Sequence, residues 1–118
     1  MIAAAVSDGP TVSIVIVSWN GRQHLEGCLT AVAAQHGVDF ETILVDNAST
    51  DGTAAFVRER FPWVQVVTLD RNLGFAGGNN AGVRAARGRY VALLNNDTMV
   101  DAGWLGRKSG RGFYSYNK

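Results

Sequence analysis

Two hydrophobic periods alternate along the chain. Four short apolar runs, rich in β-branched residues, are typical of strands buried on both faces of a sheet. They span residues 12–18, 40–45, 64–69 and 89–94. Between them lie longer segments whose apolar residues recur every three or four positions, as in helices that pack on a sheet. The pattern predicts strands and helices in strict alternation.

The first helical segment has the clearest stripe, with Leu25, Cys28, Leu29 and Val32 at the spacing of one helix face. A short helix is predicted at residues 53–60, with Ser49 or Thr50 as its cap. A third is predicted at residues 75–87, although several glycines make its first turn uncertain. Residues 99–105 are a further candidate helix.

This β-α-β-α-β-α-β order predicts an α/β fold with a Rossmann-like parallel sheet and right-handed crossovers. Ligands bind such sheets outside the carboxyl ends of the strands. Polar residues follow each predicted strand at that end, and four polar clusters on one edge predict a binding site. The clusters are residues 18–20, 46–47, 70–72 and 95–97.

Length and composition restrict the alternatives. The 118 residues, of which 47% are hydrophobic, allow one domain at most. The net charge of +1 gives no sign of nucleic-acid binding, and no apolar run approaches the length of a transmembrane segment. A single cysteine and the lack of a basic leader indicate a cytoplasmic protein. Peripheral contact with the inner membrane face stays open.

The fourth predicted strand, residues 89–94, runs directly into Asn95, Asn96 and Asp97. A carboxylate at the end of a buried strand is well placed to hold a divalent cation such as Mg²⁺, which prefers oxygen ligands. The side-chain carbonyl of Asn95 could assist Asp97. The alternative is that Asp97 only caps a following helix.

Asp46 follows the second strand and opens the segment 46–52. Its carboxylate could accept hydrogen bonds from a nucleobase imide or a ribose hydroxyl, and we favour this role. The alternative is a turn in which side chains satisfy free backbone amides. That alternative explains Ser49, Thr50 and Asp51 well. Trp19 either stacks on a base or packs in the core.

A glycine-rich segment, residues 72–80, precedes the third helix. Glycines let backbone approach a ligand, and amides at a helix N-terminus suit phosphate. The segment contains neither a Walker A loop nor a G-x-G-x-x-G motif. The alternative is that its glycines only permit unusual backbone angles.

These segments, in this order and spacing, resemble family 2 glycosyltransferases, and most closely the bacterial rhamnosyltransferase-like branch. The resemblance covers residues 11–105 and implies the nucleotide-binding half of a GT-A fold. It implies an inverting transferase that takes a sugar from a nucleotide-diphospho-sugar, a dTDP- or UDP-sugar, to a glycan or lipid-linked acceptor. Polysaccharide or cell-wall biosynthesis is the expected process.

The resemblance also implies a division of roles. Asn95 and Asp97 correspond to the metal motif D-x-D, with asparagine at its first position, and would hold Mg²⁺ or Mn²⁺. The implied donor-binding residues come from three of the polar clusters and the glycine-rich segment. They are Ser18, Asn20, Asp46, Asn72, Gly74, Gly77, Gly78, Asn79 and Asn80.

No catalytic residue is assigned, because the family's general base lies in a second half that this sequence lacks. After Asp97 the only acidic residue is Asp101. We therefore expect donor binding with little transfer. We also expect self-association through the face that the second half would cover.

Residues 1–10 form an N-terminal extension, and residues 106–118 form a basic, glycine-rich tail. The tail resembles the C-terminal end of 3-hydroxyacyl-CoA dehydrogenases, and one interpretation is that its origin is unrelated to the rest of the chain. Two alternatives remain, a non-catalytic nucleotide-binding module and, less favoured, an NAD-linked dehydrogenase fragment.

Overall fold

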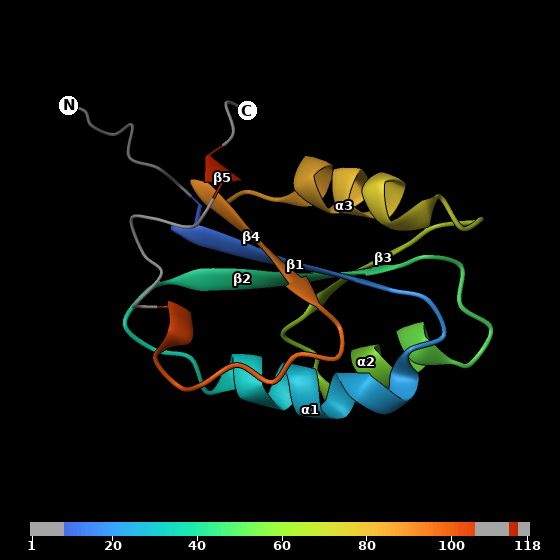
Figure 1. Ribbon diagram of the computed structural model, residues 1–118, viewed down its shortest axis with the longest axis horizontal. Helices are drawn as coiled ribbons and strands as arrows, with labels where there is room; N and C mark the ends of the chain where they lie inside the picture. The colour runs from blue at the N-terminus through green and yellow to red at the C-terminus, as the bar shows by residue number, and fades with distance from the viewer. Residues whose placement is uncertain (1–8, 106–113, 116–118) are drawn as a thin grey trace.

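The strands of the computed structural model form one sheet in the order β3-β2-β1-β4-β5 (Figure 1). The structure describes residues 9–105 and the backbone of residues 114–115. Four strands are parallel, as predicted, and the fifth is antiparallel to its neighbour. They are β1 (Val12–Ser18), β2 (Phe40–Asp46), β3 (Gln65–Thr68), β4 (Tyr90–Asn95) and β5 (Tyr114–Ser115).

Helices cover both faces of this sheet. Helices α1 (Arg22–Ala33) and α2 (Thr53–Arg60) lie on one face, and α3 (Gly74–Ala85) lies on the other (Figure 1). The predicted stripe of α1 is confirmed, because its four members are fully buried. They pack with Ile14 and Ile16 of β1, whereas Val15 of β1 faces α3. Each fully buried Ile or Leu stabilises the fold by about 1.5–3 kcal/mol.

Several element ends differ from the predictions. Strand β3 is one residue shorter at each end, and α3 starts at Gly74 and ends two residues early. The predicted cap of α2 is wrong: Gly52 occupies the N-cap position with a φ of 81°, and neither Ser49 nor Thr50 caps the helix. A left-handed residue at that position favours glycine. The candidate helix at residues 99–105 is helical only at its last two described residues.

Strand β5 was not predicted. Ser115 pairs with Tyr90 and Tyr114 pairs with Val91, so part of the outer edge of β4 is covered. The outer edge of β4 is therefore not fully exposed, because its first two residues are paired. The rest of the tail, residues 106–113 and 116–118, lies outside the described residues, and its resemblance to dehydrogenases is not tested there.

None of the helices in the described part of the chain has the length and apolar character needed to cross a membrane.

Candidate functional site

The carboxyl ends of the parallel strands meet at one edge of the sheet. Ser18 of β1 is in register with Asp46 of β2, and Asp46 is in register with Thr68 of β3. On the other side of β1, Val17 is in register with Asn95 of β4. The predicted polar clusters therefore lie side by side, and we call this edge the rim.

Asp46 lies near the centre of the rim and is buried, with 5% of its surface exposed. One carboxylate oxygen, Oδ1, accepts a hydrogen bond of 3.1 Å from the backbone N–H of Ser49. The turn alternative is thus correct for this oxygen. The structure gives Oδ2 no hydrogen bond with a described residue, so that oxygen is available to a ligand.

Asn20 joins two loops of the rim. Its backbone N–H donates to Ser49 Oγ, and its Oδ1 accepts a hydrogen bond from the backbone N–H of Thr50, both at 2.8 Å. Asn20 has a φ of 50°, a left-handed conformation that asparagine tolerates better than most residues. The residue expected to bind the donor therefore also fixes the loop beside Asp46.

Asn47 was assigned no role from the sequence, yet it organises the entrance to α3. Its Oδ1 accepts from the N–H of Leu73 at 2.8 Å, and its Nδ2 donates to the carbonyl of Gly74 at 2.9 Å. Asn72 adds a local bond, accepting from the Gly74 N–H at 2.7 Å. The sequence contains one indication of this role, because Asn47 follows a buried strand almost directly. Its partners, 26 and 27 residues away, were not visible.

Two glycines of α3, Gly78 and Gly82, allow the helix to pack closely on the sheet. A Cβ on Gly78 would lie 2.6 Å from Val17 Cγ1, and one on Gly82 would lie 2.3 Å from Val15 Cγ1. Among the predicted residues of this segment, Gly74 has a positive φ, of 77°. The buried Asn79 and the exposed Asn80 lie on the same helix, and the donor-binding role of all these residues stays a prediction.

Asp97 lies on an exposed turn just after β4. The backbone N–H of Thr98 bonds to the carbonyl of Asn95 at 3.1 Å, which closes the turn. The Asp97 carboxylate takes no hydrogen bond or ion pair from the described residues. The capping alternative is therefore wrong, since no helix starts here for Asp97 to cap.

Two partly buried contacts join this turn to β1 and α1. Asn96 Nδ2 donates to Ser18 Oγ at 3.0 Å, and Ser18 itself is only 1% exposed. The thiol of Cys28 on α1 lies 3.8 Å from the carbonyl of Asn95. Burial, together with the negative charge of Asp97, raises the pKa of Cys28 to about 11. The predicted role of Cys28 as a small core residue is confirmed.

The rim does not hold a preformed cluster of metal ligands. Among residues 9–105 no three His, Cys, Asp or Glu side chains gather closely enough to bind an ion. At the end of β4 the available oxygen donors are those of Asp97 and Asn95, which suit Mg²⁺ or Mn²⁺ and leave most coordination positions to other groups. Such a set fits an ion that is shared with phosphate oxygens of a ligand.

Aromatic side chains flank this edge. Trp19 is 57% exposed directly after β1, and Phe75 is 63% exposed in the first turn of α3. The core-packing alternative for Trp19 is wrong. An exposed indole beside the Asp46 strand end provides a flat surface for an aromatic ligand.

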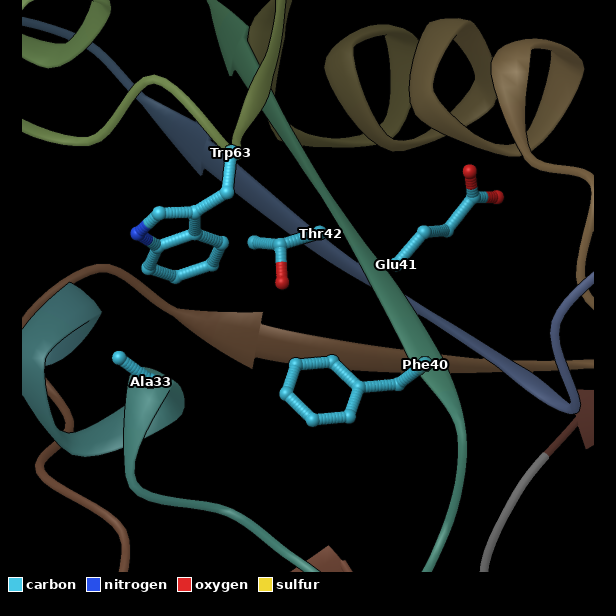
Figure 2. A pocket seen from close by; sticks show the side chains of 5 residues that line it. All are labelled: Ala33, Phe40, Glu41, Thr42 and Trp63. Carbon is cyan, nitrogen blue, oxygen red and sulfur yellow. The ribbon is translucent and has the colours of Figure 1, made fainter.

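A cavity of about 430 Å³ lies elsewhere, near the start of β2, between Phe40, Trp63 and Ala33 (Figure 2). The buried hydroxyl of Thr42 has no hydrogen-bond partner among the described residues. Glu41 points away from the cavity, toward the opposite face of the sheet (Figure 2). The cavity contains none of the rim residues, so it is not part of this site.

Comparisons with known proteins agree on one family. Residues 13–107 match the model of Glycosyl transferase family 2. The succinoglycan biosynthesis protein ExoO of Rhizobium meliloti (strain 1021) is 38% identical over 97 residues, which cover 81% of this chain and 28% of that protein.

Solved structures give the same fold. A mannosyltransferase from Pyrobaculum calidifontis, PcManGT, solved with GDP-Man and Mn²⁺, is 29% identical with a TM-score of 0.73 over 80% of this chain and 29% of that one. TarS 1-349 of S. aureus, solved with UDP-GlcNAc, has a TM-score of 0.77 at 24% identity over 84% of this chain and 30% of its own. This chain therefore spans about a third of the length of these proteins.

Proposed function

Because this chain belongs to glycosyl transferase family 2, we propose that its rim binds the nucleotide-diphospho-sugar donor of a glycosyltransferase. Family membership makes it a transferase with a GT-A fold, and ExoO, by its name, acts in succinoglycan biosynthesis. We extend this to the transfer of a sugar from a dTDP- or UDP-sugar to a glycan or lipid-linked acceptor. UDP-GlcNAc and GDP-Man in the related structures support a donor of this class.

The observation that carries the proposal is the free carboxylate of Asp97. It is exposed, takes no bond from the described residues, and lies on a turn that Ser18 and Asn96 fix. A carboxylate held in place without a partner inside the protein is suited to a ligand from outside. Its position at the carboxyl end of β4 is the usual place for ligands of parallel sheets.

Asp46 and Trp19 would recognise the nucleoside. The Oδ2 of Asp46 accepts a hydrogen bond from a base imide or a ribose hydroxyl, while Oδ1 keeps its bond to Ser49. The exposed ring of Trp19 supplies a stacking surface next to it. The two groups together favour a nucleotide over an aliphatic phosphate.

The loop into α3 would lie along the diphosphate and sugar. Asn47 fixes this loop through Leu73 and Gly74, so that the first turn of the helix faces the rim. The N-terminus of a helix favours negative charge. Ser18, Asn20, Asn72, Gly74, Gly77, Gly78, Asn79 and Asn80 complete the proposed donor set.

Asp97 and the side-chain oxygen of Asn95 would hold Mg²⁺ or Mn²⁺ together with the donor diphosphate. Such an ion, when bound, supplies positive charge beside the leaving nucleoside diphosphate. With one carboxylate in the set, most of the negative charge around the ion would come from the nucleotide. We therefore propose that metal and nucleotide bind cooperatively.

We propose that residues 11–105 form the donor-binding part of a GT-A domain and that the transfer step needs groups beyond it. An inverting transfer requires a base for the acceptor hydroxyl. Asp101 follows Asp97 as the last acidic residue of this sequence. Its carbonyl binds Gln35, and it lies on a segment that leads away from the rim. Donor binding with little transfer is the expected behaviour of the 118 residues.

Calorimetric titration with UDP and dTDP, with and without Mn²⁺, tests the proposal. We expect nucleotide binding that Mn²⁺ strengthens and that Asp97→Ala weakens toward the metal-free value. Asp39→Ala, a change of an exposed aspartate just before β2, at the end of that strand away from the rim, is the matched control and should preserve the metal effect.

Each alternative gives a different titration. Nucleotide binding that ignores Mn²⁺ and survives Asp97→Ala would indicate a non-catalytic nucleotide-binding module. Binding of NAD without UDP or dTDP would refute donor binding. Sustained sugar transfer by the purified chain would contradict the expected need for further groups.

A further inference from the structure

Residues 96–105 form a return segment that leaves the end of β4 and runs back across α1 (Figure 1). The segment carries Asp97 near its start and Leu105 at its end. It has almost no regular secondary structure, so its backbone groups need partners outside the segment. The contacts that fix the path of the return segment therefore also determine the position of Asp97.

Gln35, just after α1, binds the far end of the return segment with both halves of its amide. Its Nε2 donates to the carbonyl of Asp101 at 2.7 Å and to that of Ala31 at 3.3 Å. Its Oε1 accepts from the backbone N–H of Leu105 at 2.9 Å. Gln35 is 7% exposed, and its bond with Leu105 is buried while the other two are partly buried.

The rest of the return segment is anchored by other contacts. Leu105 is fully buried in the core that α1 shares with the sheet. At the near end, Asn96 binds Ser18, and the sulfur of Met99 lies beside Gly27 of α1. Asp97 therefore lies in a segment that is tied at both ends, and its own carboxylate is left free.

We propose that Gln35 is a positioning residue for Asp97, an inference that rests on the proposed function. Its amide offers a donor and an acceptor in one neutral group, as the carbonyl of Asp101 and the N–H of Leu105 require. With the far end fixed, the turn at Asp97 keeps one conformation before any ligand binds. A preorganised ligand group loses less conformational entropy when it binds an ion.

Gln35→Met tests this role, because methionine has a similar length and neither donor nor acceptor. The control is Gln23→Met, a change of an exposed glutamine in the first turn of α1. Two affinities are measured for each protein: that of Mn²⁺ in saturating UDP and that of UDP without metal. We expect Gln35→Met to raise the Kd of Mn²⁺ about tenfold, the scale of other positioning groups around metals. Metal-free UDP binding and the control should stay unchanged.

The split between the two affinities distinguishes positioning from general damage. If Gln35→Met weakens Mn²⁺ binding and metal-free UDP binding equally, Gln35 only supports the fold and the proposal is wrong. If it weakens neither, the proposal is also wrong. Thermal unfolding of each variant confirms that the folded protein is being titrated.

Amide hydrogen exchange gives a second readout that needs no ligand. We expect faster exchange at residues 97–100 and at Leu105 in Gln35→Met, with unchanged protection in β2 and α2. If the unmodified chain shows no metal-dependent UDP binding, the proposed function fails, whereas exchange still decides the role of Gln35. Unchanged exchange at residues 97–100 would overturn the positioning role.

Discussion

The side-chain amide of Asn96 donates a 3.0 Å hydrogen bond to the hydroxyl of Ser18, and this bond ties the turn after β4 to the end of β1. Gly21 leaves room for it: a Cβ there would lie 2.3 Å from Asn96 Nδ2 and 2.8 Å from Ser18 Oγ. Ser18 and Gly21, at the end of β1 and just after it, thus fix together with the distant Asn96 the turn that carries Asp97.

Replacing Ser18 with alanine should destabilise the protein. The change leaves the half-buried amide of Asn96 without its acceptor, and we expect a loss of about 1–2 kcal/mol in the free energy of unfolding. Urea denaturation of Ser18→Ala, Asn96→Ala and the double variant measures the coupling. Strictly additive losses would show that the bond contributes nothing.

Gly82→Ala should also destabilise, through overpacking. The new methyl would meet Val15 Cγ1 at 2.3 Å and Val45 Cγ2 at 3.1 Å, and both valines belong to the core under α3. We expect about 1–3 kcal/mol of destabilisation, reduced by the better helix propensity of alanine. Asn80→Ala, exposed on the same helix, is the control for propensity. A stabilised Gly82→Ala would show that the helix shifts without cost.

Cys28 should make stability fall at alkaline pH. Burial and the charge of Asp97 raise the pKa of its thiol from 9.0 to about 11. Between these values the unfolded chain loses the thiol proton and the folded chain keeps it. Folding stability is therefore fully present below pH 9.0 and declines toward pH 11, by about 2–3 kcal/mol.

The alkaline effect can be measured by urea denaturation between pH 8 and pH 11. Cys28→Ala should remove this part of the pH dependence, and Asp97→Asn should reduce it. A thiol that titrates near its ordinary pKa in the folded protein, followed by its reaction rate with a disulfide reagent, would contradict the prediction.

Asp51 should contribute to stability in the opposite pH range. Burial alone would raise its pKa, but hydrogen bonds from the Thr53 hydroxyl and from the N–H groups of Arg22 and Thr53 outweigh it and lower the pKa. The contribution is present above the ordinary aspartate pKa of about 4 and is lost as the pH falls through the lowered value. Asp51→Ala should therefore be less stable than the unmodified chain at pH 7 and equally stable in strong acid. A constant difference at all pH values would refute this.

Self-association through β4 stays a prediction. Leu93 is 37% exposed on the sheet face that α3 shares, and β5 pairs with only the first two residues of the strand. Leu93→Lys should shift sedimentation toward monomer if this face associates, because a charge opposes apolar contact. If the unmodified chain sediments as a monomer, the prediction of self-association is wrong.

Much of the fold follows from local sequence patterns. The run Val12–Ser18 forms a buried strand because its β-branched residues suit a strand covered on both faces. The α1 stripe is buried because its spacing matches the helical period. Even the rim was predictable, since consecutive strands in a parallel sheet end at one edge. The cap at Gly52 was not predicted, because it depends on the backbone angle of one residue. Strand β5 was not predicted, because it forms by pairing with β4, which is distant in the sequence.

The sequence by itself determined the order of strands and helices, the family resemblance and the place of a carboxylate directly after the fourth strand. Only the tertiary structure decided which polar side chains bond to other parts of the protein and which take no bond from the described residues. Polar residue types such as serine, asparagine and glutamine are common in binding sites, but three of them bond within the protein. The partner of Ser18 lies 78 positions away, that of Asn47 lies 26 away, and those of Gln35 lie 66 and 70 away. Hydrogen bonds over such distances depend on how α1 and α3 pack against the ends of β1, β2 and β4, which no local pattern specifies.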